Sequence, residues 1–82
     1  MIDNKKLEEI RYFPINFRIR KLRRILGLSQ TEFAERIHTS QTSVSLWEKG
    51  RIEPTDRSLD KIVDVFDLPS DFFLDIDIQR LE

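Results

Sequence analysis

Residues 19–50 read IRKLRRILGLSQTEFAERIHTSQTSVSLWEKG, a stretch in which three helical patterns are separated by turn signals. Gly27 is placed to end the first helix, and Gly50 is placed to end the third. Ser29 and Ser40 stand where N-terminal caps of the second and third helices are expected. We therefore predict one longer helix followed by two short helices that are joined by a tight turn.

The two short helices have well-defined limits in the sequence. Ser29 precedes Glu32 by three residues, a capping-box pattern in which the two side chains satisfy free amides of the first turn. This helix is predicted to end near Ile37 or His38. The next helix is predicted to span residues 41–48, with small polar side chains on one face and apolar side chains on the other.

Further helical patterns lie on both sides of this stretch, and together they predict an all-α fold. The first helix starts after Pro14, a fourth helix follows the cap Thr55, and a last short helix is predicted within residues 68–74. Residues 75–82 fit a strand, a helical turn or a disordered tail equally well. The apolar positions that define the first and fourth helices are Ile15, Ile19, Leu22, Leu26, Leu59, Ile62, Val63 and Phe66.

Composition limits the kinds of function that the chain can perform. With 82 residues, 39% hydrophobic and 35% charged, it is expected to form one domain with one core. The absence of Cys and the presence of a single His argue against a metal site, a cofactor and an enzyme. No apolar run approaches the roughly 20 residues that span a bilayer, so we expect no membrane association and a cytoplasmic location.

Charge is distributed unevenly along the chain, although the net charge is only −1. Residues 15–51 carry eight basic and three acidic side chains, whereas residues 52–82 carry three basic and nine acidic ones. A local positive surface attracts polyanions even when the whole molecule is nearly neutral. The distribution is compatible with nucleic-acid binding by the first part, and equally with solvated helix faces of opposite sign.

A specific family resemblance distinguishes these two interpretations. It rests on three segments, which are IRKLRRILGLSQ (residues 19–30), Glu32-Phe33-Ala34 and Trp47-Glu48-Lys49-Gly50. In this order and spacing they resemble the phage-repressor and Cro-like (XRE-type) helix-turn-helix DNA-binding family over residues 15–74. The resemblance implies a compact five-helix, lambda-repressor-like bundle whose helices 2 and 3 form the helix-turn-helix. Residues 1–14 would be an N-terminal extension, and residues 75–82 a C-terminal tail.

The resemblance also implies which residues bind double-stranded DNA. The helix over residues 41–48 would lie in the major groove, where the four base pairs present distinct hydrogen-bonding patterns. Gln41 and Thr42 match base-contacting positions, and Gln41 could form the paired hydrogen bonds to adenine that amides favour. Ser45 extends this polar face, and Leu46 would contact a thymine methyl group or pack against the backbone. The expected phosphate contacts are Gln30, Ser40, Ser43, Lys49 and Arg51.

Four further residues have expected structural roles. The resemblance implies a salt bridge between Arg23 and Glu48 that sets the angle between helices. His38 stands where the family usually has Gly, so we expect a left-handed turn residue and not a catalytic one. Asp67 replaces a frequent Gly at the end of the fourth helix, which suggests a different cap.

The C-terminal part has many apolar side chains for a small domain, namely Phe72, Phe73, Leu74, Ile76, Ile78 and Leu81. They suggest a partner surface, most simply that of a homodimer, unless the tail or residues 1–12 cover them. Leu7, Ile10 and Phe13 are spaced like an amphipathic helix. The expected function is a transcriptional regulator, a repressor that binds a palindromic operator as a dimer. The alternative is an antitoxin-like or adaptor module that binds a protein through its C-terminal third.

Overall fold

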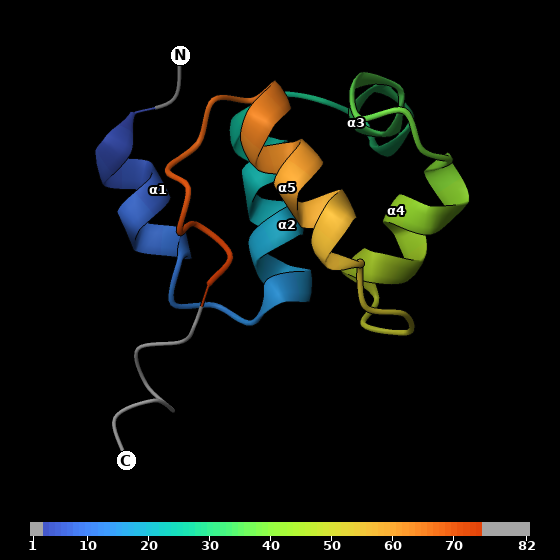
Figure 1. Ribbon diagram of the computed structural model, residues 1–82, viewed down its shortest axis with the longest axis horizontal. Helices are drawn as coiled ribbons and strands as arrows, with labels where there is room; N and C mark the ends of the chain where they lie inside the picture. The colour runs from blue at the N-terminus through green and yellow to red at the C-terminus, as the bar shows by residue number, and fades with distance from the viewer. Residues whose placement is uncertain (1–2, 75–82) are drawn as a thin grey trace.

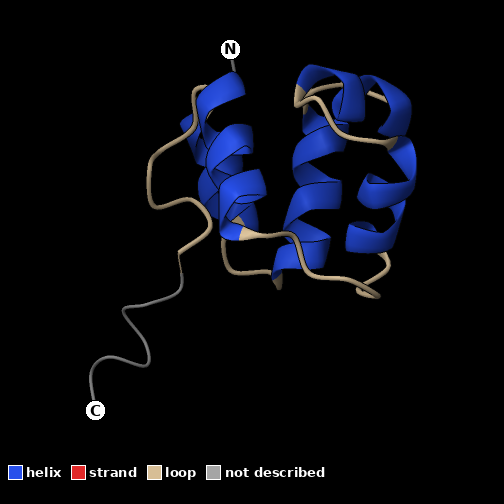
Figure 2. Cartoon of the chain, turned by 45° about the vertical axis from the view of Figure 1, so that its right-hand side comes forward, coloured by secondary structure: helices blue, strands red, loops and turns tan. Residues whose placement is uncertain are grey.

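The computed structural model describes residues 3–74, which form five α-helices and the turns that connect them (Figure 1). Within these residues all regular secondary structure is helical (Figure 2), which confirms the predicted all-α fold. No helix in this range has the length and apolarity needed to cross a bilayer. The helices are α1 (Asn4–Ile10), α2 (Ile15–Ile25), α3 (Gln30–Arg36), α4 (Gln41–Glu48) and α5 (Asp56–Val65).

The predicted N-terminal caps are confirmed for α3, α4 and α5. The Ser29 side chain accepts a hydrogen bond from the Glu32 amide at 3.0 Å, and Glu32 Oε1 accepts one from the Ser29 amide at 2.8 Å. At α4 and α5 only the cap side chain is involved: Ser40 accepts a hydrogen bond from the Ser43 amide and Thr55 accepts one from the Ser58 amide, both at 3.1 Å. These caps fix the first residue of each helix because they satisfy amides that have no partner inside the helix.

Helices α2 to α5 share one type of C-terminal end. Each is followed by a residue with positive φ, which is Gly27 (73°), His38 (59°), Gly50 (74°) or Asp67 (54°). In each case the next amide donates to the carbonyl five positions back, at 2.9 to 3.1 Å, as in a Schellman motif. The left-handed conformation of His38 is therefore confirmed. The expectation of a different cap at Asp67 is wrong, because Asp67 adopts the conformation that Gly would take.

The predicted last helix within residues 68–74 is not an α-helix, and α1 is the fifth helix of the bundle instead. The segment consists of turns in which the Phe72 amide donates to the Pro69 carbonyl and the Leu74 amide to the Asp71 carbonyl, both at 3.0 Å. These three-residue spacings form tight turns without the regular bonding of an α-helix. The segment runs beside α1 and α2 (Figure 1), and its side chains Phe72 and Phe73 are buried in the core.

One continuous hydrophobic core joins the extension, the central helices and this C-terminal segment. Leu7 and Ile10 of α1 are buried with Phe72 and Phe73, whose rings meet edge to face at 4.9 Å. The chain therefore buries Phe72 and Phe73 itself, which corrects the expectation that they belong to a partner surface. Leu74 is half exposed, and Ile76, Ile78 and Leu81 lie outside the described residues.

Candidate nucleic-acid interface

Helix α4 has an exposed polar face and a buried apolar face. Gln41 and Thr42 are exposed at its N-terminal end, whereas Val44 and Trp47 are buried in the core. Ser45, one turn after Gln41, is half-buried. The apolar side chains fix the helix against α2 and α3, and the polar side chains remain available for a ligand.

The other predicted contact residues surround this face. Gln30 is the first residue of α3, and Ser40 caps α4 with its hydroxyl 3.0 Å from the Ser43 hydroxyl. Lys49 and Arg51 are exposed in the turn that follows α4. The structure thus places these residues at both ends of α4, where they could contact phosphates on either side of a groove. Leu46 is half-buried, so only part of its side chain is available for a base.

A buried ion pair joins α2 to the last residue of α4. Arg23 Nε is 2.7 Å from Glu48 Oε2 and Arg23 Nη2 is 3.0 Å from Glu48 Oε1, so the expected pair is present in a two-pronged geometry. Glu48 is 2% exposed. The hydrogen bond to Glu48 raises the pKa of the Arg23 guanidinium above its ordinary value, although burial opposes this. Arg23 Nη1 also donates to the Leu28 carbonyl at 3.0 Å, so this side chain joins α2, the following turn and the end of α4.

The same carboxylate has two further neighbours that the sequence analysis missed. Arg20 Nε lies 3.9 Å from Glu48 Oε1, and Gln30 Nε2 donates to that oxygen at 3.0 Å. Gln30 Oε1 in turn accepts a hydrogen bond from Gln41 Nε2 at 2.7 Å. Arg20 precedes Arg23 by one helical turn, and this spacing was the available signal in the sequence. The pairing of Gln30 with Gln41 had no such signal, because it depends on how α3 and α4 are oriented.

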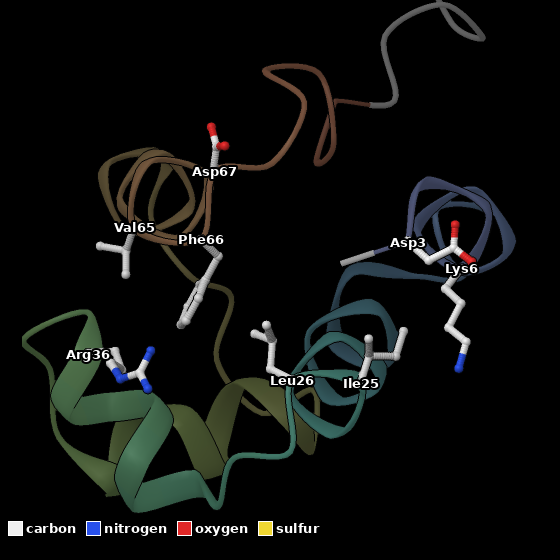
Figure 3. Close-up of a pocket in the computed structure, with 8 residues that line it drawn as sticks. All are labelled: Asp3, Lys6, Ile25, Leu26, Arg36, Val65, Phe66 and Asp67. Atoms are coloured by element: carbon white, nitrogen blue, oxygen red, sulfur yellow. The ribbon is translucent and has the colours of Figure 1, made fainter. Parts of the chain in front are cut away.

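A separate pocket of about 540 Å³ lies away from α4, between the N-terminal end of α1 and the C-terminal ends of α2, α3 and α5. Leu26 and Phe66 point into it, and Arg36 lies at its edge (Figure 3). None of the predicted DNA-contact residues lines this pocket. The pocket is therefore separate from the candidate interface, which lies on the exposed face of α4 and its flanking turns.

The arrangement of α3, a tight turn through His38, and α4 defines a helix-turn-helix DNA-binding protein. A family model described as Helix-turn-helix matches residues 19–73. The chain belongs to this family and is a DNA-binding transcriptional regulator of the XRE type. No curated protein and no solved structure matches the chain.

Proposed function

We propose that this regulator is a repressor that binds a palindromic operator as a homodimer, with α4 of each copy in the major groove. The observation that carries the proposal is the exposed pair Gln41 and Thr42 at the start of a helix whose opposite side, Val44 and Trp47, is locked in the core. Side chains that read bases need both exposure and a rigid support.

The proposed contacts fall into two classes. Gln41, Thr42, Ser45 and Leu46 would face base edges, and Gln30, Ser40, Ser43, Lys49 and Arg51 would face phosphates. Base contacts determine which sequence is bound, whereas phosphate contacts supply affinity that is independent of sequence. The exposed charges of Lys49 and Arg51 support this division, because cationic side chains at the edge of the groove attract phosphates of any sequence.

Dimerisation would place two reading helices about 34–36 Å apart, one turn of B-DNA. Leu74, which is 51% exposed, supports a partner surface at the C-terminal end of the described chain. A twofold dimer is the simplest assembly that uses the same surface on both copies.

Selection of bound duplexes from a random pool, followed by titration with salt, tests the proposal. We expect an inverted repeat with half-sites about 10 base pairs apart and an affinity that falls steeply with salt concentration. Binding that is equal for every duplex would contradict sequence-specific regulation. Transcription from a promoter that contains the selected site should decrease when the protein is added, and an increase would exclude a repressor.

The exposure of Leu74 also fits a second candidate function, that of an antitoxin-like or adaptor module. In that case the C-terminal end binds a different protein. Sedimentation of the full chain and of a chain ending at Leu74 distinguishes the two functions. A dimer that dissociates on truncation supports self-association, whereas a full-length monomer that co-purifies with a second polypeptide supports the adaptor.

A further inference from the structure

A pocket of about 370 Å³ lies where α2 and α5 begin and α4 ends, on one edge of the molecule (Figure 1). Its volume is within the range of roughly 300–1,000 Å³ that is usual for small-molecule sites. A pocket of this size with apolar walls can hold the apolar body of a small molecule. The residues that form these walls are Pro14, Ile15, Trp47, Ile52, Pro54 and Leu59.

The charged residues that line this pocket are all acidic. Glu53 and Asp56 belong to it, together with the amide residue Asn16, and no Lys or Arg does so among the described residues. The larger pocket beside α1 differs, because two acidic and two basic residues line it. An apolar pocket that carries carboxylates and no cation favours a positively charged ligand.

The helix ends at this pocket do not reverse its sign. The amino ends of α2 and α5 each carry about half a positive charge, and the carboxyl end of α4 carries about half a negative charge. These partial charges sum to about +0.5. The carboxylates of Glu53 and Asp56 contribute roughly −2 when both are ionised. The pocket is therefore negative overall.

A bound molecule would lie beside the turn that carries two of the predicted phosphate contacts. Gly50 and Ile52 line the pocket, and Arg51 stands between them in the chain. A charge in the pocket is therefore close enough to the phosphate-binding residues Lys49 and Arg51 to act within the Debye length of about 8–10 Å.

We propose that this pocket binds a small organic amine, whose apolar part lies against the apolar walls and whose ammonium group lies beside Glu53 and Asp56. Resting on the proposed function, the amine acts as a corepressor. Its positive charge offsets two carboxylates that repel the phosphates of bound DNA, and this strengthens binding of the operator. By linkage, DNA strengthens binding of the amine by the same factor.

Trp47 is a built-in reporter of the pocket, because it is the single tryptophan of the chain and lines the pocket. A smaller pocket of about 150 Å³ also borders Trp47. The charged residues of that smaller pocket are Arg57 and Lys61, which repel a cation. A change in tryptophan fluorescence that is caused by a cation and not by its neutral analogue therefore reports on the acidic pocket.

The first test is titration of the full chain, without DNA, with cyclohexylmethylammonium. The matched probe is cyclohexylmethanol, which has the same apolar body and no charge. We expect a saturable change in fluorescence with a dissociation constant on the order of 1 mM. The alcohol should bind about 2- to 30-fold more weakly, since two exposed ion pairs are lost. No saturable change at roughly ten times that concentration, or equal binding of the two probes, would overturn the site.

A double variant, Glu53→Gln with Asp56→Asn, locates the charge that is responsible. It removes both carboxylates and keeps the shape of the pocket, so it should weaken binding of the amine by about the same 2- to 30-fold. Unchanged binding of the alcohol shows that the pocket is intact. Asp64→Asn is the matched control, because Asp64 is exposed on α5 and does not line the pocket. Equal binding of the amine by the double variant and by Asp64→Asn would overturn the inference.

The second test is the affinity for the operator selected from the random pool, measured at constant ionic strength with and without saturating amine. We expect the amine to raise this affinity by about 2- to 5-fold in the wild type and the alcohol to leave it unchanged. The double variant should bind the operator more tightly than the wild type and should not respond to the amine. An unchanged or lower affinity of the wild type with amine would overturn the corepressor role. A chain that selects no operator would contradict the proposed function instead, and the fluorescence titration would still decide whether the pocket binds the amine.

Discussion

Two arginines on α2 hold opposite ends of the molecule by different means. Arg23 binds the carboxylate of Glu48 at the end of α4, whereas Arg18, which is 2% exposed, binds backbone carbonyls. Arg18 Nη2 donates to the Phe13 carbonyl at 2.6 Å, and Arg18 Nη1 donates to the Phe72 carbonyl at 2.8 Å. Arg18 thus fastens the end of the extension to the C-terminal turns.

The two arginines differ in where the groups that they bind are located relative to the predicted DNA contacts. The Glu48 carboxylate accepts a hydrogen bond from Gln30, which in turn accepts one from Gln41. Hydrogen bonds therefore connect Arg23 to the exposed polar face of α4. The carbonyls bound by Arg18 belong to Phe13 and Phe72, in the extension and the C-terminal turns, and neither residue is among the predicted DNA contacts. Stability and recognition should therefore be coupled around Arg23 and separate around Arg18.

Glu48→Ala should have the largest effect on stability. It removes one partner of a buried ion pair and leaves Arg23 without its carboxylate, which costs about 3–5 kcal/mol of unfolding free energy. Urea denaturation measures the loss. Glu53→Ala, at an exposed loop position, is the control and should change stability by less than about 0.5 kcal/mol. Equal losses of unfolding free energy in the two variants would mean that the Arg23–Glu48 ion pair contributes nothing to stability.

Arg18→Met should destabilise the fold by about 2–4 kcal/mol, because two carbonyls lose charged donors while the aliphatic part of the side chain is kept. Under conditions in which the variant remains folded, its DNA affinity should equal that of the wild type. Fluorescence anisotropy with the selected operator measures this. A clearly weaker affinity in the folded variant would show that the two ends of the molecule are not separate.

Lys49→Ala and Arg51→Ala should each affect binding without affecting the fold. Removal of one phosphate contact lowers the slope of log affinity against log salt concentration by about 0.9, equally for all DNA sequences. Lys61→Ala provides a matched control, because Lys61 is an exposed cation on α5. Should Lys61→Ala reduce the slope as much as Lys49→Ala, the phosphate-binding surface would have to include α5.

His38→Gly should have the smallest effect, an increase in stability of up to about 1 kcal/mol. His38 has a φ of 59°, and glycine adopts this left-handed conformation without the steric cost of a side chain. Asp67→Gly, with a φ of 54° after the end of α5, should give a similar gain. Thermal unfolding measures both, and a loss of stability would indicate that the side chain itself contributes at that position.

The sequence predicted the parts of this structure that depend on the identity of side chains. The caps Ser29, Ser40 and Thr55 have local signals, the left-handed turn at His38 follows from the family resemblance, and all are present. The partner of Arg23 was also identified, because Glu48 belongs to the motif that carries the family resemblance.

The role of Arg18 could not be predicted in the same way. Two of its acceptors are the carbonyls of Phe13 and Phe72, a group that every residue has, and they converge only when the chain near Phe13 meets the turns near Phe72. The helix predicted within residues 68–74 failed for a related reason. Burial of Phe72 and Phe73 against α1 outweighs local helical preference in so short a segment.

The 2.7 Å bond between Gln30 and Gln41 has a consequence for how regulators of this architecture change their targets during evolution. Gln41 is exposed, so a mutation there is tolerated by the fold, but it removes the hydrogen bond that holds the side chain of Gln30. A descendant that recognises a different operator would therefore tend to substitute both positions together. Specificity would then be inherited as a pair of residues from two helices, and a mutation at only one of them would produce a stable protein with a poorly defined target.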